Sequence, residues 1–157
     1  MAKTSILCQL NHGCMGCCGH NYDSKERVVQ AIRFNTKEFD EVNPKCKEEM
    51  IQFRDRFDVN NLNNGVCRNL ICVGNKFFCP LHPLRNNGED LRIGHCNINY
   101  LCFTTKEFAT WPEELKQKFI DFIKQKNLDN LNYSLMMDDN SLLLEFKKLN
   151  KDKFSKL

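Results

Sequence analysis

Three cysteines near the start of the chain are the side chains best suited to bind a metal ion. Cys14, Cys17 and Cys18 form the pattern C-x-x-C-C, with Gly16 inside it. A two-residue spacer lets two thiolates converge on one ion, because the turn between them brings both sulfurs to one side and glycine frees the backbone for that turn. Adjacent side chains do not easily point the same way, so Cys18 either completes the same shell through a bent backbone or serves a second metal.

The remaining ligands can come from the same loop or from the middle of the chain. A tetrahedral thiolate site needs four ligands, and Cys8 is the other thiol close to the first loop. The alternative is a set of cysteines at wide spacing, namely Cys67, Cys79, Cys96 and Cys102. Ligands spread in this way would tie distant segments of the chain together.

Four other residues have a structural interpretation beside the ligand one. Cys72 lies in the apolar stretch 70–73 and suits the core, and Cys46 falls on the apolar face of a predicted helix. His82 is as well suited to a structural hydrogen bond as to ligation. We expect His95 to lie behind the ligands or at the surface.

The cellular compartment decides how the ten cysteines are interpreted. Residues 1–10 contain no apolar stretch long enough for a signal peptide, and no window approaches the roughly 20 apolar residues of a membrane span. We therefore expect a cytoplasmic protein without membrane association. Because cytosolic thiols are kept reduced, metal ligation is favoured over disulfides. The alternative, that most of the thiols are small buried hydrophobes, fits poorly with their clustering.

The elements that must position these thiols are mainly helical. We predict a single domain over residues 1–157, in a mainly α fold with irregular cysteine-rich metal-binding loops and a short hairpin, a small α+β arrangement. The metal-binding loops are residues 8–20 and 66–103, a helical insert covers 24–58, and C-terminal helices with a basic tail cover 110–157.

Capping signals predict where the helices begin, and two short strands are predicted between them at 70–73 and 76–78. The first helix is expected to run from about 24 to 34 or further. The four starting signals are Asp23 with Glu26, Asn43 with Pro44, Thr110 with Pro112, and Asp139 or Asn140.

Several short motifs accompany the cysteines. C-R-N-L begins at Cys67, C-P-L-H-P begins at Cys79, and N-N-G-E-D-L-R covers Asn86–Arg92. With the C-x-x-C-C loop, they resemble the zinc- or iron-chelating cysteine-cluster family over residues 8–103. This family commonly has another cysteine three residues before C-x-x-C-C, where this chain has Asn11. The resemblance implies binding of zinc or an iron–sulfur centre, with these ligand candidates: Cys14, Cys17, Cys18, Cys67, Cys79, Cys96 and Cys102.

Thiolate-rich sites select zinc, Cu(I) or iron–sulfur clusters. None of the cysteine runs has the bacterial or plant-type ferredoxin spacing. We therefore predict Zn²⁺ as the cofactor, with an iron–sulfur cluster as the alternative.

Two classes of function follow from such a site. Since the sequence has no phosphate loop, nucleophile elbow or H-E-x-x-H pattern, a metal-stabilised interaction module with a protein partner is favoured over catalysis. The alternative is a metal-dependent or iron–sulfur-dependent enzyme or accessory redox factor. A nucleic-acid-binding role is a weaker third. The net charge of +3 resides in residues 144–157 and fits a solvated helix end, and zinc-finger spacing is absent.

Overall fold

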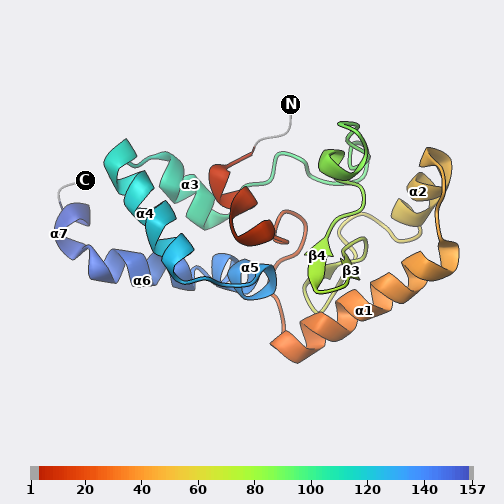
Figure 1. Cartoon of the computed structure of the whole chain (residues 1–157), viewed down its shortest axis with the longest axis horizontal. Coiled ribbons are helices and arrows are strands. Elements are labelled where there is room, and N and C mark those ends of the chain that lie inside the picture. Colours follow the sequence, from red (N-terminus) through yellow and green to blue (C-terminus); the bar gives the residue numbers. More distant parts are fainter. Residues whose placement is uncertain (1–3, 156–157) are drawn as a thin grey trace. The chain divides into compact units, whose positions relative to one another are not determined.

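Helices make up most of the regular structure, and two short antiparallel hairpins supply the strands (Figure 1). The computed structural model describes residues 4–155, so Met1–Lys3 and Lys156, a lysine of the predicted basic tail, lie outside the described residues. The expected fold class, mainly α with a small β component, is confirmed. The elements in chain order are the 3-10 helix η1 (Ile6–His12), α1 (Lys25–Val42), α2 (Lys47–Arg54), β1 (Leu62–Asn63), β2 (Val66–Cys67), β3 (Ile71–Val73), β4 (Lys76–Phe78), the 3-10 helix η2 (Pro83–Arg85), α3 (Phe103–Ala109), α4 (Glu113–Gln125), α5 (Asn130–Asp138), α6 (Ser141–Leu149) and α7 (Lys151–Phe154).

The chain divides into two compact units. Residues Cys17–Tyr100 form the first, which we call the hairpin unit. The described parts of Lys3–Gly16 and Leu101–Leu157 form the second, which we call the helical unit. The single domain expected from the chain length stays a prediction, because compactness alone does not tell whether each unit folds independently.

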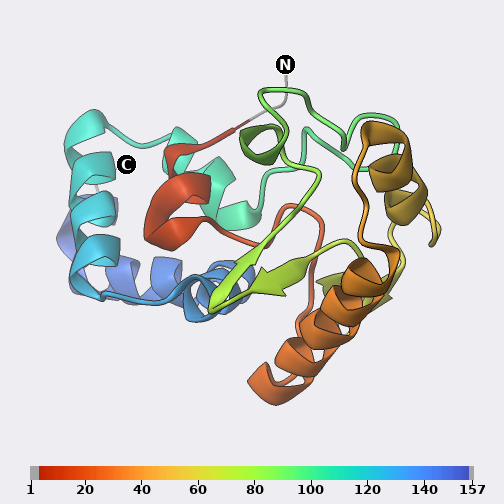
Figure 2. The ribbon, with the colours of Figure 1, turned by 45° about the vertical axis from the view of Figure 1, so that its right-hand side comes forward.

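In the hairpin unit, α1 packs against the β3–β4 hairpin (Figure 2). Strand β3 pairs with β4 in the register Ile71↔Phe78, close to the strands predicted from the sequence. Helix α1 begins after Ser24, whose hydroxyl accepts a hydrogen bond from the Arg27 amide. One face of α1 buries Val28, Ala31 and Ile32, as its apolar spacing requires.

The boundary between α1 and α2 differs from the prediction. Asn43 ends α1 in the left-handed conformation (φ 45°), with its amide bonded to the Phe39 carbonyl, instead of starting the next helix. Helix α2 begins only at Lys47, and Cys46 is its N-cap residue. Cys46 is exposed, so its assignment to the core is wrong. Asparagine tolerates positive φ better than most residues, which explains the stop.

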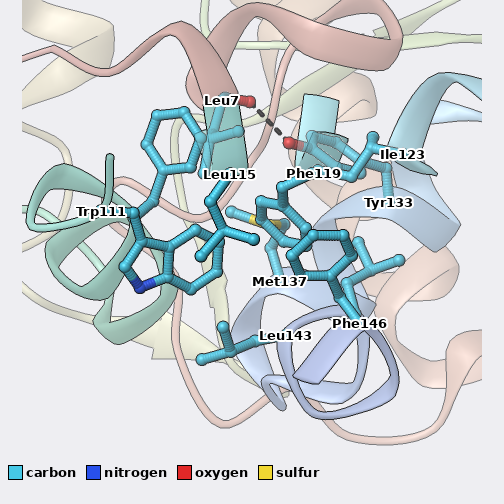
Figure 3. Close-up of a cluster of buried hydrophobic side chains, with 11 residues drawn as sticks. Leu7, Trp111, Leu115, Phe119, Ile123, Tyr133, Met137, Leu143 and Phe146 are labelled. Carbon is cyan, nitrogen blue, oxygen red and sulfur yellow. Dashed lines mark hydrogen bonds between the residues drawn. The ribbon is translucent and has the colours of Figure 1, made fainter. Parts of the chain in front are cut away.

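The helical unit has the larger apolar core, built from η1 and α3 to α6 (Figure 3). Trp111 is buried and stacks on Phe146, with ring centroids 5.8 Å apart. The buried Tyr133 hydroxyl donates a 2.7 Å hydrogen bond to the Leu7 carbonyl, which anchors η1 to α5. The predicted starts of α4 and α6 are confirmed at Pro112 and Asn140, their N-cap residues, whereas Thr110 is the C-cap residue of α3 and does not begin a helix.

Candidate metal centre

The eight predicted ligands fall into two groups, one in each compact unit. Cys17, Cys18, Cys67, Cys79 and Cys96 belong to the hairpin unit, whereas Cys8, Cys14 and Cys102 belong to the helical unit. All eight side chains are partly exposed, and all ten cysteines of the chain are free thiols. The C-x-x-C-C loop is therefore divided between the units. Convergence of Cys14 and Cys17 on one ion stays a prediction.

Cys18 is the point at which the thiols of the hairpin unit meet. Its sulfur donates a hydrogen bond to the Cys17 sulfur at 3.9 Å, and it also interacts with the sulfurs of Cys67 and Cys96. Residues 16–18 form a turn, so the bent backbone considered from the sequence does let adjacent thiols converge. Four sulfurs at a Zn–S distance of about 2.3 Å lie about 3.8 Å apart in a tetrahedron. The Cys17–Cys18 separation matches one edge of that tetrahedron.

The thiols of the hairpin unit are hydrogen-bonded to one another, but they are not arranged around a common point. Within residues 4–155, no three His, Cys, Asp or Glu side chains have the arrangement that would hold a metal ion. Ligands must lose their protons before they bind a metal, and S–H···S contacts connect thiols that still carry protons. The type and proximity of the donors therefore fit a thiophilic metal, while the ligand geometry stays untested.

Two glycines bring the first cysteine loop against the β1–β2 hairpin. The His20 amide donates to the Gly65 carbonyl at 3.0 Å. A Cβ on Gly19 would lie 2.6 Å from the Gly65 carbonyl oxygen, and a Cβ on Gly65 would lie 2.6 Å from the His20 carbonyl oxygen. Only residues without side chains allow this approach. It brings Cys18 close to Cys67, which follows Gly65 by two residues.

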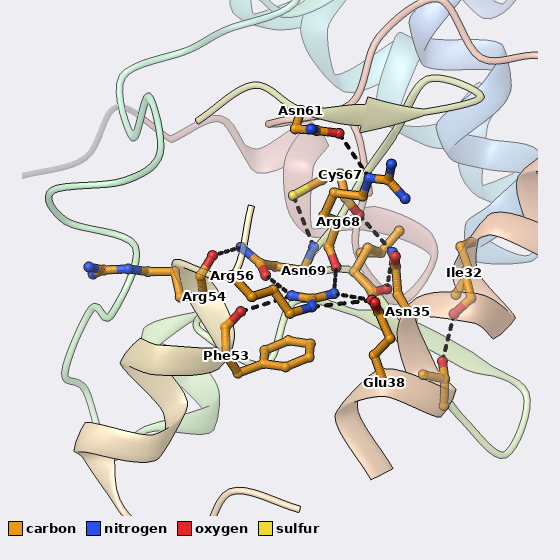
Figure 4. A network of polar contacts seen from close by, with 12 residues as sticks. Ile32, Asn35, Glu38, Phe53, Arg54, Arg56, Asn61, Cys67, Arg68 and Asn69 are labelled. Carbon is orange, nitrogen blue, oxygen red and sulfur yellow. Dashed lines mark hydrogen bonds and ion pairs between the residues drawn. The ribbon is translucent and has the colours of Figure 1, made fainter. Parts of the chain in front are cut away.

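The turn after Cys67 is held by side chains from α1 and from the segment that follows α2 (Figure 4). Asn35 of α1 is fully buried, and its amide donates to the carbonyls of Cys67 and Leu70, both at 2.9 Å. Arg56 donates to the Asn69 side chain at 2.8 Å and pairs with Glu38. These contacts fix the C-R-N-L motif.

The Cys79 and Cys96 segments are joined through the G-E-D-L-R motif. The Leu91 amide donates to the Leu81 carbonyl at 3.1 Å, and the Cys96 amide donates to the Arg92 carbonyl at 2.9 Å. Arg92 itself is buried and makes two 2.7 Å hydrogen bonds to the carboxylate of Asp90. The motif thus sets the position of Cys96 and places a cation near the thiols.

Contacts among the thiols and nearby arginines shift the thiol pKa values in opposite directions. The hydrogen bond from Cys18 lowers the pKa of Cys17 to about 7, and the charge of Arg92 contributes to the same effect. The pKa of Cys67 is lowered by its contact with Cys18 and by the Asn69 amide, which donates to the Cys67 sulfur at 3.5 Å. As the donor, Cys18 has a raised pKa. Thiolates therefore form first at Cys17 and Cys67.

Cys79 is the fifth thiol of this group. Burial raises its pKa, and the charges of Cys67, Cys17 and Cys96 raise it further. It therefore lies within electrostatic range of the other thiols, but burial is the main cause of its raised pKa.

A cavity of about 120 Å³ adjoins the thiols of Cys17, Cys18, Cys67 and Cys96. Its wall includes His95, whose Nδ1 is 3.0 Å from the Asp55 carboxylate. The other polar and aromatic side chains of the wall include His20, Arg68 and Tyr100.

Two of the less certain candidates make structural hydrogen bonds. The Nδ1 atom of His82 accepts from the Leu84 amide at 3.2 Å. The Cys72 sulfur donates to the Gly74 carbonyl at 3.1 Å, and its side chain is only partly buried. Both contacts are within the hairpin unit and do not involve the other thiols.

Sequence reasoning overlooked the residues that support the thiols. Asn35 carries no local signal, because its role depends on α1 packing beside the C-R-N-L turn. Asn69 and Arg92 lie inside the C-R-N-L and G-E-D-L-R motifs, so the motifs themselves point to them.

Comparison with protein-family models, curated proteins and solved structures finds no match to this chain. The family resemblance therefore rests on the motifs alone and stays a prediction. Among residues 4–155, no helix combines the length and apolar character that crossing a membrane requires.

Proposed function

We propose that this protein is a metal-binding cysteine-cluster protein whose hairpin unit holds one zinc ion through Cys17, Cys18, Cys67 and Cys96. The observation that carries the proposal is the meeting of the Cys18 thiol with the other three thiols. In this proposal Cys79 is a neighbouring thiol outside the ligand shell. The protein acts in the cytoplasm as a metal-stabilised interaction module for another protein.

The small size of the strands supports a stabilising role for the metal. Each strand of the hairpin unit is two or three residues long, and an isolated hairpin is marginally stable at best. A structural zinc supplies roughly 10–16 kcal/mol of apparent binding free energy in zinc-finger peptides, against a stability of about 5–15 kcal/mol for a whole domain. The ion would therefore account for most of the stability of this unit.

The cavity supports a second candidate function, a metal-dependent or iron–sulfur-dependent enzyme or accessory redox factor. Because the cavity reaches the same four thiols, a small molecule could approach a metal held there. A closed site with four protein ligands favours the interaction module, and an exchangeable coordination position favours the enzyme.

Metal analysis combined with an absorption spectrum tests the proposal on protein purified without oxygen. We expect stoichiometric zinc and a colourless solution. Iron with acid-labile sulfide and a visible band that bleaches on reduction would show that the site holds an iron–sulfur cluster instead of zinc. A fully folded protein that contains no stoichiometric metal overturns the metal-based function.

Substitutions identify the ligands. Cys67→Ser is expected to lower both metal content and thermal stability, whereas Cys46→Ala, at an exposed thiol of the same unit, leaves both unchanged. Cys79→Ser should retain the metal, since we place Cys79 outside the ligand shell. Equal metal content in Cys67→Ser and wild type would refute the assigned shell.

A further inference from the structure

We propose that the helical unit contains a second zinc site of its own, formed by the thiols of Cys8, Cys14 and Cys102. This inference extends the proposed function and rests on it for the choice of zinc. It concerns thiols of the helical unit alone. Three protein ligands leave the fourth tetrahedral position to water or to a ligand from outside the chain.

The backbone brings Cys8 and Cys14 together. The Cys14 amide donates to the Cys8 carbonyl at 3.0 Å. Between them, Asn11 and His12 adopt positive φ angles of 51° and 68°, which turn the chain back on itself at the end of η1. Because this loop is closed by a hydrogen bond between the two cysteines themselves, their side chains start from neighbouring points.

Cys102 reaches the same region from the C-terminal part of the chain. It is the N-cap residue of α3, and its side chain packs against the apolar core that Cys14 also contacts. The three thiols lie within electrostatic range of Tyr133, the residue whose hydroxyl donates a hydrogen bond to η1 at Leu7. Their charges reinforce the effect of burial, which raises the pKa of Tyr133.

The immediate surroundings of these thiols suit thiolates. The Gly16 amide donates to the Cys14 sulfur at 3.3 Å, as the Asn69 amide does to Cys67 in the hairpin unit. A hydrogen bond from an amide two residues ahead stabilises the charged form of the sulfur. The Cys102 sulfur donates to the Thr105 hydroxyl oxygen at 3.6 Å, so this thiol gives up that hydrogen bond with its proton when it binds zinc.

Binding requires a rearrangement of the three cysteine side chains. The three thiols are not yet arranged around a common point, and rotation about χ1 moves each sulfur between its staggered positions. A zinc ion held there would connect the segment before Gly16 to the first turn of α3. It would add a cross-link to a unit whose apolar core is already extensive.

Zinc content per chain distinguishes this site from the one in the hairpin unit. We expect about two zinc ions in the wild-type full chain, about one in Cys14→Ser and Cys102→Ser, and about one in Cys67→Ser. Cys46→Ala should keep both. One ion in wild type, kept by Cys14→Ser and lost by Cys67→Ser, overturns the second site and leaves the proposed function intact. If wild type holds one ion and each of Cys14→Ser and Cys67→Ser removes it, the second site is overturned in favour of a single shared site. If wild type holds no ion, both proposals are overturned.

Alkylation of the wild-type protein provides a test that does not depend on the folding of variants. With zinc bound, Cys8, Cys14 and Cys102 should be modified at least tenfold more slowly than after chelation, as measured by peptide mass spectrometry. If zinc protects the hairpin-unit thiols but leaves these three at their chelated rates, the second site is excluded.

Discussion

The contact of Arg92 with Cys17 gives the motif G-E-D-L-R a chemical role. Arg92 is buried, is held by both carboxylate oxygens of Asp90, and contributes its charge to the lowered pKa of Cys17. A guanidinium fixed in this way favours the thiolate, which is both the metal ligand and the nucleophile. The motif therefore favours the form of Cys17 that the proposed ligand role requires.

This role predicts the pH dependence of Cys17 reactivity in the metal-free protein. Because only the thiolate reacts, alkylation of Cys17 should rise with pH through a midpoint near 7, the lowered pKa. Removing the positive charge in Arg92→Gln disfavours the thiolate, so the midpoint should move to higher pH. Peptide mass spectrometry after short pulses of iodoacetamide measures both profiles. An unchanged midpoint in the variant would show that Arg92 does not act on this thiol.

At the scale of elements, features set by neighbouring residues were predictable from the sequence. Features set by tertiary contacts were not. The starts of α4 and α6 were predictable because Pro112 and Asn140 are local sequence signals, although neither makes a side-chain capping hydrogen bond. Helix α5 was missed, since Asn130 and Ser134 are buried in it and obscure the apolar pattern. Cys46 was placed wrongly because it continues the apolar spacing of α2 toward the N-terminus, although α2 begins only at Lys47.

The sequence predicts which residue type forms the candidate site, but not which of the thiols lie together. Clustered thiols in the sequence identified the metal candidates. Their division between two units depends on the close approach of Gly19 to Gly65 and on the packing of η1 in the helical unit, which no short motif encodes.

The Gly19–Gly65 approach predicts a substitution that should displace one hairpin without removing any ligand. In Gly65→Ala the new methyl group would lie 2.6 Å from the His20 carbonyl oxygen, so the two segments must separate. We expect a loss of about 1–3 kcal/mol in unfolding free energy beyond the backbone strain, together with weaker metal binding.

The matched control is Gly74→Ala. Gly74 also has a positive φ angle, 62° against 83° for Gly65, but a Cβ there meets no atom within 4 Å. It therefore measures the strain of alanine at positive φ alone. Denaturant unfolding and zinc titration of both variants test the prediction, and equal losses would show that the close approach is unimportant.

Helix α1 is connected to the C-R-N-L turn through the side chain of Asn35. Asn35→Ala would remove the side-chain donor that the carbonyls of Cys67 and Leu70 share, which is expected to cost about 1–3 kcal/mol in unfolding free energy. Lys37→Ala, on an exposed part of the same helix, should cost less than about 0.5 kcal/mol. Urea denaturation measures both. A small effect for Asn35→Ala would mean that α1 is not needed to hold this turn.

For the whole molecule, the two units differ in what stabilises them. The helical unit buries a continuous set of aromatic and aliphatic side chains, including Trp111, Phe119 and Phe146. The hairpin unit has strands of two or three residues and long irregular segments that carry the proposed metal ligands. We therefore expect apolar burial to contribute most of the stability of the helical unit, and the proposed metal cross-link to contribute more to the hairpin unit.

This difference predicts a partial response to removal of the metal. Chelation should increase amide hydrogen exchange throughout residues 62–96 by at least tenfold, while α4 and α6 retain their protection. Trp111 is the single tryptophan of the chain and lies in the core of the helical unit, so its fluorescence should not change. Re-addition of zinc should restore slow exchange, which separates metal loss from irreversible damage. Simultaneous loss of protection in both units would show instead that the chain unfolds as one cooperative structure when the metal leaves.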